Sequence, residues 1–131
     1  MNVQKICIIG DGLAGLSSAL VLSQENIKID LYIGSNFKKL KNDDRTTAIS
    51  ESSYQFIKQR FNIKNFSIFW PSKEIKLFYE DNKIINNFLN FKEKKKILMY
   101  IFKNKELKQK LNKLIQKKKN IKLIKKNITS I

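Results

Sequence analysis

The first third of the chain contains two apolar segments separated by a glycine-rich turn. An apolar run over 4–9 leads into the sequence GDGLAG at 10–15, and apolar residues at helical spacing follow it. This pattern predicts a buried strand over 4–9, a tight turn and a helix over 13–25. Alternating apolar residues predict a second strand over 27–33. We therefore expect a β-α-β unit with two parallel strands and a right-handed crossover.

Shorter elements are predicted along the rest of the chain. A polar, lysine-rich loop over 35–44 precedes a helix over 53–61, with Ser52 as its N-cap and Gln55 three residues later. The apolar residues expected on the buried face of that helix are Phe56, Ile57 and Phe61. After a connection over 66–72, the expected elements are a hairpin with strands over 75–79 and 84–91, a strand over 97–102, an amphipathic helix over 104–118, a strand over 121–124 and a final turn or strand over 128–131.

Length and composition limit the possible functions. The chain has 131 residues, enough for one domain with a modest core and too few for a complete two-domain dinucleotide-dependent enzyme. It contains no His, which excludes His-based acid–base catalysis, catalytic triads and ordinary His metal sites, and we expect no metal. The single cysteine, Cys7, lies in the first predicted strand, where we expect a small core residue. No secretory signal and no apolar run of membrane-spanning length is present, so we expect a cytoplasmic protein.

The net charge of +16 is concentrated toward the C-terminus. Fifteen of the 27 basic residues lie from Lys92 onward, against only Glu93 and Glu106. Such a segment attracts anionic membrane surfaces and nucleic acids. Only Arg45 and Arg60 are arginines, and the abundant Lys, Ile and Asn are the residues of A/T-rich codons. Because nucleic-acid sites favour the bidentate contacts of Arg, we do not expect nucleic acid as a partner.

The three glycines of the turn have separate expected roles. Gly10 permits the sharp turn, Gly12 lets the main chain approach a pyrophosphate, and Gly15 lets helix and strand pack closely. The N–H groups at the start of the helix, together with the helix dipole, form an anion site. In NAD and FAD binders an acidic residue usually ends the second strand and binds the adenosine ribose. Ile33 occupies that place and Asp30 lies three residues earlier, which argues against a simple NAD-dependent dehydrogenase.

A second motif, DRTTAIS at 44–50, follows the glycine turn after the polar loop. Together the two motifs resemble the flavin-dependent aromatic-ring monooxygenases, specifically the ubiquinone-biosynthesis hydroxylases, in which a D-R-T-T-A-L stretch precedes a Ser-led helix. The sequence MYIFKNKEL at 99–107, followed by Leu111, is similar to the N-x-x-L-x-x-x-L helix start of that family. The resemblance covers essentially the whole chain. It implies an α/β fold: a Rossmann-like FAD-binding domain with a parallel sheet and a β-hairpin insertion.

The resemblance also implies a function and a set of site residues. The chain would bind FAD and, in its complete form, use NAD(P)H and O2 to hydroxylate a polyprenylated aromatic ring in ubiquinone biosynthesis. Carried over by position, Arg45 would contact the flavin side of FAD, and Asn104 would hydrogen-bond toward it. The implied cofactor-binding residues are Gly10, Gly12, Leu13, Ala14, Gly15, Arg45, Asn104 and, through its main chain near adenine, Ile128. Simpler interpretations are a surface salt bridge of Arg45 with Asp43 or Asp44, and a helix N-cap at Asn104.

The chain lacks several features of the family it resembles. Family members are several-fold longer and carry a later Asp-Gly motif, a Gly-Asp motif that contacts the ribityl chain, and a substrate sheet that covers the isoalloxazine ring. We therefore expect 1–131 to be the incomplete N-terminal part of an FAD/NAD(P)-binding domain, without a substrate domain and without monooxygenase turnover of its own. The complete enzyme would also bind the polyprenyl-aromatic substrate and associate peripherally with the inner membrane or with a ubiquinone-biosynthesis complex.

Three other interpretations remain open from the sequence. The first is another Rossmann-type flavoprotein or NAD(P)-binding protein, such as an amine oxidase-like enzyme, against which the motif at 44–50 argues. The second is a basic, non-catalytic module that binds nucleic acid or membrane through 92–131, with an affinity that collapses with salt. The third is a decayed gene product whose exposed apolar faces favour aggregation. Saturable, salt-tolerant binding of FAD would separate the flavoprotein interpretation from the last two.

Overall fold

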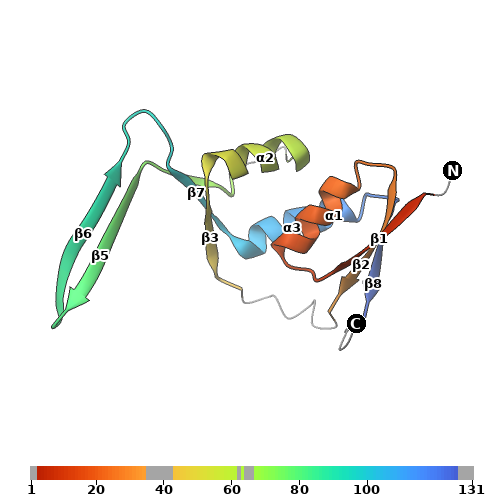
Figure 1. Ribbon diagram of the computed structural model, residues 1–131, viewed down its shortest axis with the longest axis horizontal. Coiled ribbons are helices and arrows are strands. Elements are labelled where there is room, and N and C mark those ends of the chain that lie inside the picture. Colours follow the sequence, from red (N-terminus) through yellow and green to blue (C-terminus); the bar gives the residue numbers. More distant parts are fainter. Residues whose placement is uncertain (1–2, 35–42, 62, 64–66, 127–131) are drawn as a thin grey trace.

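A three-stranded parallel sheet forms one end of the protein (Figure 1). Its strands β1 (Gln4–Ile9), β2 (Ile27–Ile33) and β8 (Ile121–Lys125) lie in the order β1-β2-β8. Helix α1 (Leu13–Leu22) connects β1 to β2. The predicted β-α-β unit and the α/β fold class are therefore confirmed. The computed structural model describes residues 3–34, 43–61, 63 and 67–126.

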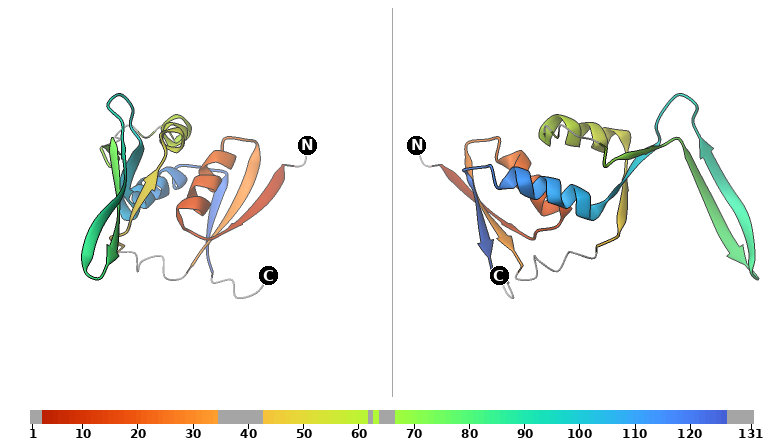
Figure 2. Two further views of the ribbon diagram at one scale, coloured as in Figure 1. Left: turned by 60° about the vertical axis from the view of Figure 1, so that its left-hand side comes forward. Right: turned by 180° about the vertical axis from the view of Figure 1, so that it is seen from behind.

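Helices α1 and α3 (Asn104–Ile115) cover one face of this sheet (Figure 2). The alternation in β2 turns Ile29, Leu31 and Ile33 toward the helices, and all three side chains are buried. Burial of such a side chain stabilises the fold by about 1.5–3 kcal/mol. The helical residues that complete this part of the core are Leu16, Ala19, Leu20, Leu107, Leu111 and Ile115.

A second, antiparallel sheet lies on the other side of the two helices (Figure 2). Its strands are β3 (Thr46–Ile49), β7 (Met99–Lys103) and β4 (Trp70–Ser72), in the order β3-β7-β4. Helix α2 (Glu51–Phe61) follows β3 and packs on the sheet through Tyr54, whose ring stacks on Tyr100 with centroids 3.8 Å apart. The sequence predicted β7 but neither β3 nor β4, because four-residue and three-residue strands carry almost no periodic signal.

Strands β5 (Glu74–Asp81) and β6 (Ile84–Lys92) form the predicted hairpin, which projects away from the rest of the protein (Figure 1). We call this hairpin, residues 74–92, the arm. Asn82 and Lys83 form its tip with positive φ angles of 50° and 66°, as a two-residue hairpin turn requires. Large apolar side chains of the arm are exposed, with Ile85 at 71% and Phe88 at 68%. Its register places an apolar set on one face, namely Ile75, Leu77, Tyr79, Leu89 and Phe91.

The first strand is less buried than predicted. Cys7 is exposed rather than part of the core. Ile6 and Ile8 are partly buried, whereas Ile9 is 51% exposed. Among the described residues β1 pairs only with β2. Helices α1 and α3 lie on the same face of the parallel sheet. The prediction of a buried strand with a core cysteine was therefore wrong, because one face and one edge of β1 remain open.

Helices α1 and α3 are shorter than predicted. Helix α1 ends at Leu22 instead of near 25, because Ser23 donates its hydroxyl hydrogen to the carbonyl oxygen of Leu20 at 2.7 Å and ends the helical pattern. Helix α3 ends at Ile115, and the two residues that follow belong to a turn. The predicted element over 128–131 and most of the polar loop over 35–44 lie outside the described residues.

Helix α2 begins earlier than predicted. Its first residue is Glu51, and Ser50 rather than Ser52 precedes it. The main-chain N–H of Ser53 donates to Ser50 Oγ at 3.2 Å, which is the hydrogen bond that an N-cap side chain accepts. The expected apolar face is only partly buried, because Phe56 is 46% exposed. The sequence SESS at 50–53 contains several possible caps, and the pairing of β3 determines which one is used.

Candidate dinucleotide-binding site

The glycine turn between β1 and α1 contains two glycines that the fold itself requires. Gly10 has a φ angle of +113°, a conformation that other residues adopt only with strain. Its N–H donates a hydrogen bond to the carbonyl oxygen of Tyr32 at 2.9 Å, which ties the turn to the end of β2. At Gly15 a Cβ atom would overlap the carbonyl oxygen of Gly10, because α1 packs directly on the turn.

Gly12 is required by neither conformation nor packing. It is the N-cap residue of α1, with φ of −71° and ψ of 173°, which any residue adopts. A Cβ atom at Gly12 would meet no atom of the described residues within 4 Å. The space beside Gly12 is therefore open. Without a side chain at this position, a bound group can approach the main chain of the turn closely.

The N-terminus of α1 adjoins this open space. Gly12 offers no side chain to cap the helix, and the first turn of α1 contains no acidic residue. The first N–H groups of a helix have no partner inside the helix, and the helix dipole adds a positive partial charge there. The predicted residues Leu13 and Ala14 begin the helix at this point. The arrangement suits an anionic group such as a pyrophosphate.

The motif at 44–50 lies against the start of α3. The main-chain N–H of Asn104 donates to the carbonyl oxygen of Arg45 at 3.0 Å. Thr47 donates its hydroxyl hydrogen to Asn104 Oδ1 at 2.6 Å. Lys103 occupies the N-cap position of α3, so the interpretation of Asn104 as an N-cap is wrong. The Asn104 side chain instead links α3 to β3.

Arg45 is paired with Asp43. Its Nε donates to Asp43 Oδ1 at 2.7 Å and its Nη2 donates to Asp43 Oδ2 at 2.9 Å, while the arginine side chain is 78% exposed. The guanidinium holds the pKa of the Asp43 carboxyl below its usual value, and the carboxylate raises the pKa of Arg45. The structure thus contains the salt bridge that the sequence left as an alternative. A contact between Arg45 and a cofactor stays a prediction.

Lys108 joins α3 to the glycine turn and is not among the residues predicted from the sequence. Lys108 Nζ lies 2.8 Å from Asp11 Oδ2, and the two side chains are only 12% and 24% exposed. A signal for this residue is present in the sequence, because Lys108 follows Asn104 by four positions and such residues share a face of a helix. The pair places the Asn104 side of α3 beside the turn.

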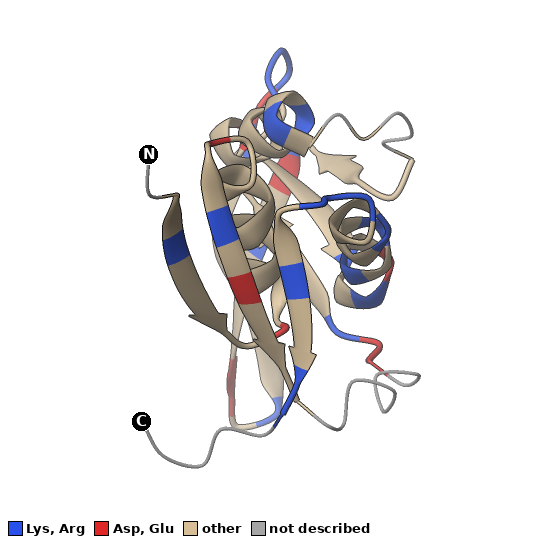
Figure 3. Cartoon of the chain, turned by 90° about the vertical axis from the view of Figure 1, so that its right-hand side faces the viewer, with Lys and Arg blue, Asp and Glu red and all other residues tan. Residues whose placement is uncertain are grey.

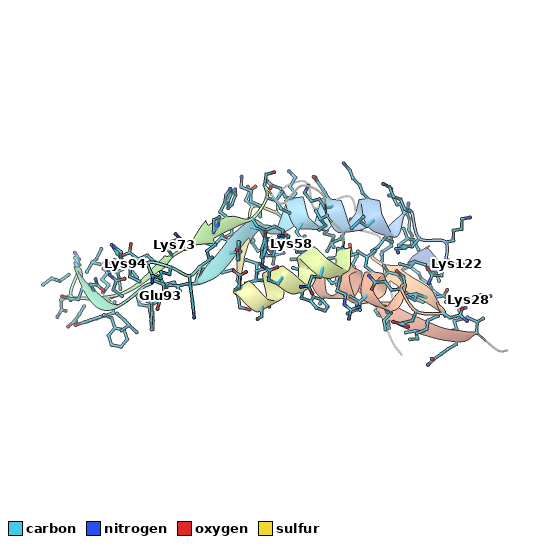
Figure 4. The ribbon with its side chains drawn as sticks, turned by 90° about the horizontal axis from the view of Figure 1, so that it is seen from above. Lys28, Lys58, Lys73, Glu93, Lys94 and Lys122 are labelled. Carbon is cyan, nitrogen blue, oxygen red and sulfur yellow. The ribbon has the colours of Figure 1, made fainter. Side chains whose placement is uncertain are left out.

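Asp30 does not take the place of the missing ribose-binding carboxylate. Its Oδ2 lies 2.8 Å from Lys5 Nζ on the open face of the parallel sheet, onto which Figure 3 looks. The Asp30 carboxylate raises the pKa of Lys5 through this hydrogen bond. Lys28 and Lys122 come from β2 and β8 at the same end of the molecule (Figure 4). Asp30 lies in the middle of β2, as the sequence indicated, and its neighbours there include lysines of the sheet.

The structure brings together most of the predicted site residues. Five of them form the glycine turn and the start of α1, and Asn104 lies on the helix that contacts this turn through Lys108. The carbonyl oxygen of Arg45 accepts a hydrogen bond from the main-chain N–H of Asn104, but the Arg45 guanidinium pairs with Asp43. Ile128 lies outside the described residues, so its expected position near adenine stays a prediction.

Comparison with known proteins supports the fold. No protein-family model and no curated protein sequence matches the chain. The p-nitrophenol 4-monooxygenase PnpA from Pseudomonas putida DLL-E4 matches 93% of this chain with a TM-score of 0.66 and 12% sequence identity. The peptidyl tryptophan dihydroxylase QhpG, essential for tryptophylquinone cofactor biogenesis, matches 98% with a TM-score of 0.57 and 9% identity. The matched region is 31% of the PnpA chain and 26% of the QhpG chain, so this chain spans less than a third of either protein.

At these identities the likeness establishes the fold alone. The chain shares the fold of the matched regions of these two proteins, which are by name a monooxygenase and a dihydroxylase. Neither name refers to ubiquinone biosynthesis. In the part of the chain that the structure describes, every helix is too short or too polar to cross a lipid bilayer.

Proposed function

We propose that this chain binds FAD at the glycine turn, as the FAD-binding part of a flavin monooxygenase. The complete enzyme would use NAD(P)H and O2 to hydroxylate a polyprenylated aromatic ring in ubiquinone biosynthesis. Bound FAD supplies the oxygen chemistry, and the residues of the chain bind and orient it. In this proposal Gly10, Gly12 and Gly15 shape the turn that receives the pyrophosphate, and the N–H groups of Leu13 and Ala14 face it.

The open space at Gly12 is the observation that carries the proposal. The fold itself requires glycine at two of the three positions, because Gly10 has a positive φ angle and α1 packs closely on the turn at Gly15. Gly12 has neither reason, and it lies where the helix N-terminus favours an anion. A dinucleotide pyrophosphate has the charge and the need for close main-chain approach that account for this glycine.

The narrower assignment to ubiquinone biosynthesis depends on the second motif. The motif at 44–50 and the helix start at Asn104 resemble that family, and the Thr47 hydroxyl hydrogen-bonds to Asn104 Oδ1. The two segments that carry the resemblance therefore contact each other next to the glycine turn. In the family this region faces the flavin, and the proposal gives Arg45 and Asn104 the same task.

The proposal assigns no turnover to the chain by itself. The chain spans less than a third of PnpA and of QhpG, and a monooxygenase must also enclose the flavin and exclude water from it. The polyprenyl-aromatic substrate would be bound by the complete enzyme. Because such a substrate is lipid-soluble, the complete enzyme would meet it at the inner membrane, where the lysine-rich segment from Lys92 onward favours anionic lipid.

An FAD titration of the purified chain tests the proposal. We expect saturable quenching of flavin fluorescence that persists at high salt, and we expect Gly12→Val to abolish it. The Val side chain fits the open space, so the unfolding free energy of Gly12→Val should fall by no more than about 1 kcal/mol, the cost of a poorer N-cap. The matched control is Ser18→Val, at an exposed position on the same helix, which should bind FAD like the parent chain.

Other results would favour the alternatives. A folded chain that binds neither FAD nor ADP contradicts the proposal. Binding of NADH or NADPH in preference to FAD favours a nicotinamide-binding protein of the same fold. Binding of nucleic acid or lipid vesicles that disappears at high salt, without FAD binding, favours the basic module.

A further inference from the structure

The ion pair between Asp11 and Lys108 connects the glycine turn to a residue 97 positions later in the chain. Asp11 lies between Gly10 and Gly12, inside the turn itself. Lys108 comes from the middle of α3, with its Nζ 2.8 Å from Asp11 Oδ2. Both side chains are largely shielded from solvent, at 12% exposed for Lys108 and 24% for Asp11. Because of this shielding, the electrostatic attraction between the two side chains is stronger than in an ordinary surface pair.

Asp11 creates an electrostatic problem for a ligand at this turn. Its carboxylate is one residue from Gly12, where the open space and the N-terminus of α1 would receive a negatively charged pyrophosphate. The Asp11 carboxylate and a pyrophosphate carry charges of the same sign, and such charges repel each other more strongly where solvent is partly excluded. A glycine turn that contains an acidic residue therefore needs a cation close to that residue.

Lys108 is placed to provide this cation. Besides its contact with Asp11, its charge adds to the lowering of the pKa of Asp43, of which the Arg45 guanidinium is the main cause. Asp43 has its own partner in Arg45, with an Nε to Oδ1 distance of 2.7 Å. Lys108 therefore forms an ion pair with the turn, through direct contact with Asp11.

We propose that Lys108 is a positioning residue for the dinucleotide, because its ammonium group cancels the charge of Asp11 and so permits a pyrophosphate at the N-terminus of α1. This inference rests on the proposed function. Lys108 acts through Asp11 and needs no contact with the ligand. The proposal therefore concerns the charge of the pair rather than its effect as a mechanical link between α3 and the turn.

Four variants separate charge from mechanical linkage, with ADP and FAD as the probes. Lys108→Met keeps most of the side-chain stem and leaves the Asp11 carboxylate uncompensated, and we expect ADP affinity to fall about tenfold. Asp11→Asn leaves the ammonium without its carboxylate partner, and ADP should bind more tightly than to the parent chain. The double variant Asp11→Asn, Lys108→Met has no ion pair and no carboxylate, and its affinity should return to within about threefold of the parent. The matched control is Lys113→Met, an exposed lysine near the end of the same helix.

The ranking of affinities decides the inference. If the pair acts only as a link, the two single variants and the double variant all lose it, and all three should bind ADP equally weakly. That result overturns the inference, as does an equal effect of Lys108→Met and Lys113→Met. The loss in Lys108→Met should also shrink at high salt, because salt weakens the repulsion between the uncompensated Asp11 charge and the ligand. A parent chain that is folded by circular dichroism and binds neither ADP nor FAD overturns the proposed function instead.

Discussion

Strand β2 of the parallel sheet and strand β5 of the arm both contain alternating apolar residues. These residues are buried in β2 and largely exposed in the arm. In β2, Leu31 is 0% exposed and Ile29 is 1% exposed, because α1 and α3 cover that face. In the arm, Tyr79 is 52% exposed and Phe91 is 48% exposed. Alternation therefore determines that a segment is a strand and which residues share a face. Whether that face is covered depends on the elements that the chain folds against it.

The arm has no such element among the described residues. Its closest internal contacts are between its own two strands, including an edge-to-face pair of Tyr79 and Phe88 with ring centroids 6.4 Å apart. A two-stranded hairpin is only marginally stable in water without a surface to pack on. The stability of the chain should therefore come from the two sheets and the helices between them, which we call the body. The following experiments test this division.

The largest expected difference is between a body residue and an arm residue of similar size. Leu111 is 0% exposed and lies between the sheets, so Leu111→Ala should lower the unfolding free energy by about 2–5 kcal/mol. That loss is a large part of the roughly 5–15 kcal/mol that stabilises a domain. The matched arm variant, Ile85→Ala, removes a side chain that is 71% exposed and should change the unfolding free energy by less than about 0.5 kcal/mol. Urea denaturation followed by circular dichroism measures both, and similar losses would mean that the arm belongs to the cooperative unit.

A smaller effect should appear at alkaline pH. Burial in the body, together with a hydrogen bond to the Glu51 carboxylate, raises the pKa of Tyr100 to about 12 from an ordinary value of 10.0. The folded state thus favours the neutral phenol, and this contribution to stability is complete below pH 10 and is lost as the pH rises through 12. The urea midpoint of the parent should fall more steeply over this range than that of Tyr100→Phe. Equal slopes for the two proteins would show that Tyr100 ionises freely.

The smallest effect is expected when the arm is removed. The N–H of Glu93 donates to the carbonyl oxygen of Lys73 at 2.9 Å, so the two ends of the arm lie side by side, with Lys94 next to them (Figure 4). A two-residue Asn-Gly turn can therefore replace 74–92. The shortened chain should unfold cooperatively within about 0.5 kcal/mol of the parent. Loss of cooperative unfolding would place the arm within the core, contrary to the division drawn here.

The sequence predicted the elements with strong periodicity and missed features that depend on neighbours. The second strand was predicted with its observed bounds, and the start of α3 at Asn104 was also predicted. Cys7 was placed in the core because an apolar run at the start of a β-α-β unit resembles a strand that is covered on both faces. Its exposure follows from the open face of the sheet, which no local pattern reveals. Likewise, the choice of Ser50 over Ser52 depends on where β3 ends.

The site was predictable to the extent that one short segment forms it. The glycine turn forms as expected from its sequence, because the conformation of Gly10 and the packing of Gly15 are local properties. Lys108 was missed because its partner is Asp11, which lies far away in sequence. The pairing of Arg45 with Asp43, two residues away, was one of two interpretations that the sequence left open. The spacing from Asn104 places Lys108 on the same face of α3 but does not identify its distant partner, whereas the turn glycines form a motif within one short segment.

The parallel pairing of β2 with β8 has a consequence for the order of folding. About 90 residues separate these neighbouring strands, and closing so large a loop has an entropic cost that slows folding. At ribosomal rates of about 5–20 residues per second, β2 is made roughly 5–20 s before its partner. We therefore expect the nascent chain to carry the glycine turn on an unfinished sheet until β8 has been made. The turn would gain its final surroundings only after residue 125 has emerged from the ribosome.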